Sequence, residues 1–152
     1  MNEKRTIGFW VLIIVALFLS VIFLLGQTLA VFNYDLTVKL GLQESSEEIG
    51  SVGIAFAKGF GFADTVFYIP LILAGVIGLF KRKSWGLLSM FGALAITVYW
   101  PLVHLYTIFV ERTAITLSQD TYISFIIILP LIIIYSLWGM YYLYKNKEEY
   151  LK

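Results

Sequence analysis

The third long apolar stretch of the chain contains its single histidine, within the segment YWPLVH at 99–104. With successive residues 100° apart around a helix, one face of this stretch carries Thr97, Trp100, His104, Thr107 and Glu111. Imidazole titrates near neutral pH, so His104 could exchange protons with a carboxylate such as Glu111 or Asp64. An ionisable face is costly against lipid and is expected to face protein or water.

Polar and aromatic positions on the other apolar stretches complete a candidate ligand site. Its hypothetical lining is Gln27, Asp64, Tyr68, Trp100, His104 and Glu111. A mostly apolar and aromatic lining with a few polar groups is typical of small-molecule and lipid sites. The same residues would equally form an ordinary bundle core joined by hydrogen bonds.

The three prolines all lie inside apolar stretches, at Pro70, Pro101 and Pro130. Each is eight or nine residues from the outer end of its stretch, which is about 12 to 13 Å at the rise of a helix. A proline removes one backbone donor, and kinks at one depth would spread the outer helix halves and open a pocket. Proline is also frequent in membrane helices that have no such pocket.

Composition restricts the class of protein. Apolar residues make up 60% and charged residues 14% of the chain, which is far from the usage of soluble domains. There is no cysteine and one histidine, so disulfides, cysteine-based zinc sites and multi-histidine metal sites within one chain are excluded. No P-loop, GxGxxG, HExxH or GxSxG motif occurs. We therefore expect no cofactor, no metal and no nucleic-acid partner.

Four apolar stretches are each long enough to cross roughly 30 Å of hydrocarbon as a helix. The expected spans are 7–32, 63–80, 85–110 and 122–144, within a single membrane domain covering 1–152. The predicted fold class is an all-α integral membrane protein, a bundle of four transmembrane helices.

The segment 35–62 is the one substantial piece expected outside the spans. Within it, SSEE at 45–48 is typical of a capping box, in which Ser45 caps a helix and Glu48 reaches back. Apolar residues then recur at helical spacing at Ile49, Val52, Phe56 and Phe60. These features predict a short interfacial helix between the first two spans, either as a plain connector or as a lid.

Basic residues predict the orientation. Eight lie on the side of the termini (Lys4, Arg5, Lys81, Arg82, Lys83, Lys145, Lys147 and Lys152), against Lys39, Lys58 and Arg112 on the other side. The other side also holds seven of the ten acids, giving it a formal charge of 3 − 7 = −4. By the positive-inside rule we expect a multi-pass protein of the cell membrane with cytoplasmic N- and C-termini.

Three functional classes fit these features, and the sequence alone does not decide whether the protein is an enzyme. The favoured class binds a lipid or small hydrophobic ligand in an outer-half cavity, or acts as an accessory subunit of a membrane complex. The alternatives are a small transporter or channel subunit that works as an oligomer, and a membrane-embedded isomerase that uses His104 with Glu111 or Asp64. Expected partners are membrane lipids, with a homo-oligomer or a larger membrane complex left open.

Overall fold

The computed structural model describes residues 5–111, 113 and 117–151. Four helices in this part of the chain are long and apolar enough to cross a membrane. The first comprises α1 (Ile7–Phe23), the π-helical turn η1 (Leu24–Thr28) and α2 (Leu29–Phe32). After α3 (Tyr34–Lys39), the second comprises α4 (Ser46–Ala63), the π-helical turn η2 (Asp64–Tyr68) and α5 (Ile69–Phe80). The third is α6 (Ser84–Val110) and the fourth is α7 (Gln119–Lys145), followed by a 3-10 turn, η3 (Lys147–Glu149).

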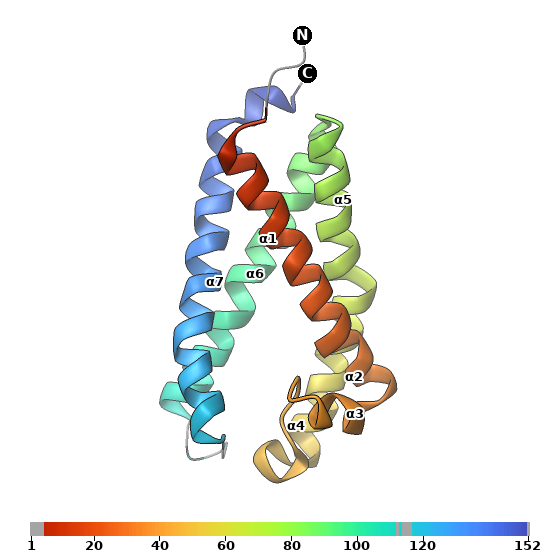
Figure 1. Cartoon of the computed structure of the whole chain (residues 1–152), viewed down its shortest axis with the longest axis vertical. Coiled ribbons are helices and arrows are strands. Elements are labelled where there is room, and N and C mark those ends of the chain that lie inside the picture. Colours follow the sequence, from red (N-terminus) through yellow and green to blue (C-terminus); the bar gives the residue numbers. More distant parts are fainter. Residues whose placement is uncertain (1–4, 112, 114–116, 152) are drawn as a thin grey trace.

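The long helices run alternately up and down, so the molecule has two distinct ends (Figure 1). Both chain termini, η3 and the turn between α5 and α6 lie together at what we call the termini end. The short helices α2 and α3, the start of α4 and the far end of α6 lie at the opposite, distal end.

At the termini end the helices pack around a continuous apolar core. Its most deeply buried side chains include Phe9, Leu12, Ile13, Ile72, Leu79, Met90 and Leu143. Helices α5 and α6 approach most closely at Gly78 and Gly86, where a methyl group on either glycine would overlap the backbone of the other. Small residues at such positions let two helix backbones approach closely.

Interhelical burial decreases sharply at the level of the prolines. In α7 the buried residues are Leu129, Ser136, Gly139 and Leu143, so none lies in the first ten residues of that helix. In α6, Ile108 is the one buried residue beyond Pro101, and in α4 only Gly61 is buried. Pro101 and Pro130 lie inside helices that continue through them, and Pro70 is the second residue of α5, just after η2. The distal halves of α4, α6 and α7 therefore leave much of their apolar surface uncovered.

The segment 35–62 differs from an isolated interfacial helix. The capping box is present, since the Ser45 amide donates to Glu48 Oε2 at 2.7 Å. Gly50, at φ 67° and ψ 176°, then interrupts the helix after one turn. Beyond Gly50 the chain continues in one helical path through η2 to Phe80, so the helix expected over 63–80 starts well before that range. Gly61 permits this path because its missing side chain leaves room for the backbone of Gln27.

Tyr34 fixes α3 to the connection that follows it. Its hydroxyl donates to the Glu44 carbonyl at 2.9 Å, and its ring is buried. Burial, with the nearby charges of Glu44 and Glu48, raises the pKa of Tyr34 to about 12. An unfolded tyrosine loses its proton near pH 10, whereas Tyr34 in the folded protein keeps its proton up to about pH 12. The free energy of unfolding should therefore fall as the pH rises from 10 to 12.

Candidate functional site

A buried polar contact joins η2 to α6 at the level of the prolines. The Tyr68 hydroxyl lies 2.5 Å from Thr97 Oγ1, and both residues are buried. Thr97 Oγ1 donates its one hydrogen to the Ala93 carbonyl at 2.7 Å, so Tyr68 must be the donor to Thr97. The Tyr68–Thr97 hydrogen bond thus lies between the packed core of the termini end and the less covered distal half.

Trp100 lies beside the Tyr68–Thr97 pair in an aromatic cluster. The Phe23 ring centroid is 4.9 Å from that of Tyr68 and 5.6 Å from that of Trp100, both in edge-to-face arrangements. Trp100 Nε1 is buried and has no hydrogen-bond partner among the described residues. Buried indole N–H groups usually have a hydrogen-bond acceptor, so the N–H group of Trp100 is a donor left without one among the described residues.

His104 stands one turn further toward the distal end and is exposed. Its Nδ1 lies 2.9 Å from the Trp100 carbonyl, and because a carbonyl only accepts, Nδ1 carries the proton. The imidazole also packs edge-on against Trp100 at 5.5 Å and against Phe125 of α7 at 6.5 Å. Glu111 is exposed at the end of α6, two turns beyond His104. The structure thus brings Tyr68, Trp100 and His104 together and leaves Glu111 apart from them.

The remaining two predicted site residues belong to a pair of facing π-helical turns. Gln27 lies in η1 and Asp64 in η2, and the turns are joined where Thr65 Oγ1 lies 2.8 Å from Thr28 Oγ1. The Gly26 carbonyl in η1 accepts from Gln43 Nε2 at 3.2 Å. Single π-helical turns inside long helices often occur at functional sites, because they reorient the side chains that follow.

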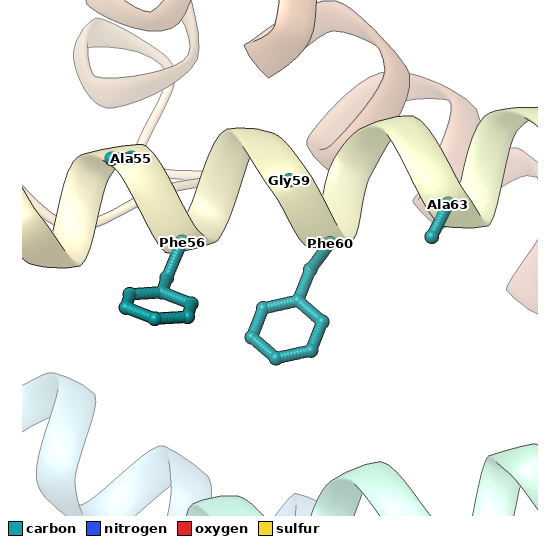
Figure 2. Close-up of a pocket in the computed structure, with 5 residues that line it drawn as sticks. All are labelled: Ala55, Phe56, Gly59, Phe60 and Ala63. Atoms are coloured by element: carbon teal, nitrogen blue, oxygen red, sulfur yellow. The ribbon is translucent and has the colours of Figure 1, made fainter.

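An open apolar recess lies on α4, distal to these turns. It is lined by Ala55, Phe56, Gly59, Phe60 and Ala63, and its volume is about 530 Å³. Figure 2 shows the phenyl rings of Phe56 and Phe60 projecting from α4 on the side where α6 and α7 lie. Their exposed fractions are 66% and 57%, so no described helix covers them. We call this the α4 recess.

Sequence reasoning identified Phe56 and Phe60 as part of a helix face but not as a site. Thr28, Thr65 and Gln43 were also missed as partners of the π-helical turns. The one available signal was Pro70, because a proline inside an apolar helix predicts a local change in backbone bonding. No comparable signal precedes η1.

The Tyr68–Thr97 pair predicts an asymmetric cost of substitution. Thr97→Val leaves the Tyr68 hydroxyl buried without an acceptor, which should lower the free energy of unfolding by about 2 kcal/mol. Tyr68→Phe removes the donor but leaves Thr97 bonded to Ala93, so the loss should be about 1 kcal/mol. Equilibrium unfolding of both variants in the same detergent measures the difference. Equal losses, or a larger loss for Tyr68→Phe, would contradict the assigned donor direction.

Comparison of the chain with known protein families, with curated proteins and with solved structures finds no match.

Proposed function

We propose that the chain is an integral membrane protein of the cell membrane, with the termini end in the cytoplasm. The four long apolar helices support this placement. The charges also support it: the described basic residues at the termini end are Arg5, Lys81, Arg82, Lys83, Lys145 and Lys147, against Lys39 and Lys58 at the distal end. Lys4, Arg112 and Lys152, which also enter the sequence count, lie outside the described residues.

Within this placement, the protein binds a lipid or small hydrophobic ligand in the α4 recess. One observation carries the proposal: two phenyl rings point into the bundle's distal half and remain uncovered. The recess volume of about 530 Å³ falls within the usual range of ligand pockets, roughly 300 to 1,000 Å³. Its lining contributes no charged side chain, so an alkyl chain or another apolar group is the occupant that it suits.

The bilayer setting determines where the affinity of such a site comes from. Lipid tails are as apolar as the recess, so moving a chain from the bilayer into it gains little from the hydrophobic effect. Contact with Phe56 and Phe60 must therefore supply the affinity through close packing. Removing both rings should weaken binding by about tenfold or more, the effect of about 1.4 kcal/mol of lost contact.

Ligand-induced thermal stabilisation tests this proposal. Hexadecanol, an uncharged single-chain probe, is titrated into the full chain in a short-chain detergent while the unfolding midpoint is followed by circular dichroism. A ligand at ten times its Kd stabilises by about 1.4 kcal/mol, which should raise Tm by about 4 °C. The variant Phe56→Ala/Phe60→Ala should show no such rise at the same concentration.

The matched control is Phe62→Ala/Phe67→Ala. These two phenylalanines lie on the same long helix, are 59% and 60% exposed, and do not line the recess. This control should respond to hexadecanol like the unaltered chain. An absent response in the unaltered chain, or an equal response in both double variants, would overturn the proposal.

A further inference from the structure

Asp64 is a carboxylate within an apolar helix, and no described residue forms an ion pair with it. It is half-buried in η2, inside the long helix Ser46–Phe80. Among the residues that the structure describes, it makes no hydrogen bond and no ion pair. A charged side chain at such a position in a membrane is costly and usually serves a ligand, an ion or a proton.

The polar groups nearest along the helix are already engaged. The Thr65 hydroxyl lies 2.6 Å from the Gly61 carbonyl and 2.8 Å from Thr28 Oγ1. The Tyr68 hydroxyl is bonded to Thr97. Asp64 is therefore the one strong acceptor in η2 whose hydrogen-bonding capacity is unused.

The position of Asp64 places this acceptor at the edge of the α4 recess. Asp64 directly follows Ala63 and stands one turn after Phe60, and both of those residues line the recess. Residues four apart on a helix lie on the same side, one above the other. A molecule lying across Phe60 can thus reach the carboxylate with its polar end.

Chemistry indicates what that polar end should be. A carboxylate only accepts hydrogen bonds, so it favours a head group with N–H donors and repels an anionic one. A phenyl ring beside it, such as that of Phe60, also attracts a cation through its face. Among the described residues, the distal end has two basic and seven acidic residues, which further favours cations.

We propose that the α4 recess binds a single-chain amphiphile with a cationic, N–H-donating head group, which pairs with Asp64 while the alkyl chain lies across Phe56 and Phe60. This inference rests on the proposed function, to which it adds the chemical class of the ligand. The head group supplies the selectivity that an apolar recess lacks inside an apolar bilayer.

The test compares three probes that share one chain length: hexadecylammonium, hexadecanol and hexadecanoate. Binding to the full chain in nanodiscs of zwitterionic lipid is quantified by native mass spectrometry, with each probe's partitioning corrected using empty nanodiscs. The unaltered chain should bind hexadecylammonium at least tenfold more tightly than hexadecanoate. In Asp64→Asn this preference should disappear, while hexadecanol binding stays unchanged.

The matched control is Glu47→Gln, which removes one negative charge from the exposed start of α4 and should keep the preference. A preference that survives in Asp64→Asn, or is lost equally in Glu47→Gln, would overturn the role of Asp64 while the recess itself stands. Failure of all three probes to bind the unaltered chain would instead overturn the proposed function. Equal affinity of the unaltered protein for the three probes would show that the recess binds alkyl chains without distinguishing their head groups. That result would also reject this inference.

Discussion

Replacing Gly86 by leucine should abolish stable packing of α5 against α6. The two helices meet at Gly78 and Gly86, where even a methyl group would overlap backbone atoms of the opposite helix. Backbone atoms cannot rotate away as a flexible side chain can, so the helices must separate. Overpacking of a core usually costs about 1 to 3 kcal/mol, and a clash with backbone falls at or beyond the upper end.

The measurement is equilibrium unfolding of Gly86→Leu in detergent, followed by circular dichroism. Gly59→Leu is the matched control, because a methyl group at this helical glycine would meet nothing within 4 Å. We expect a free energy of unfolding at least about 3 kcal/mol lower for Gly86→Leu and little change for Gly59→Leu. Similar stabilities for the two variants would show that α5 and α6 do not meet at this point.

Replacing Arg5 by methionine should detach the N-terminal segment from the end of α5 and destabilise the termini end. One terminal nitrogen of Arg5 donates to two carbonyls at the end of α5. It lies 2.8 Å from the Phe80 carbonyl and 3.1 Å from the Leu79 carbonyl, which also accepts from the Arg82 amide at 3.2 Å. Its guanidinium carbon lies 4.4 Å from the Phe9 ring centroid, and its other terminal nitrogen is 3.8 Å from Glu149 Oε2. Hydrogen bonds from a charged donor contribute about 1.5 to 3 kcal/mol, so we expect a loss of about 2 kcal/mol.

Methionine keeps most of the apolar stem of Arg5, so the variant isolates the charged head. Lys81→Met is the control, since Lys81 is exposed in the turn after α5 and its side chain forms no hydrogen bond to any described residue. Unfolding of both variants is measured under the same conditions. A loss for Arg5→Met no larger than that for Lys81→Met would mean that Arg5 does not hold the N-terminal segment to α5.

The sequence predicted the long helices well wherever charged residues limit an apolar stretch. The spans expected over 7–32, 85–110 and 122–144 correspond to Ile7–Phe32, Ser84–Val110 and Gln119–Lys145. The second helix was the exception. Lys58 and the glycines at 50, 53, 59 and 61 favoured a short helix separate from the second span. In the structure one helical path runs on to Phe80, and Gly61 leaves room in it for the backbone of Gln27.

The site was predictable only in part. The face carrying Trp100 and His104 follows from helical spacing, and the structure places both residues in contact. The α4 recess could not be predicted in the same way, because it results from neighbours that do not cover Phe56 and Phe60. A hydrophobic stripe in a sequence does not reveal which part of it another helix will bury. The π-helical turn that holds Gln27 had no signal at all, since the backbone shift there involves no proline.

Native mass spectrometry of the full chain, released gently from its membrane, tests the central claim most directly. We predict one amphiphile-sized mass bound per chain, retained in Phe62→Ala/Phe67→Ala and lost in Phe56→Ala/Phe60→Ala. A bare unaltered chain, a bound mass that both double variants retain equally, or a stoichiometric protein partner in place of the small ligand would contradict a lipid-binding α4 recess.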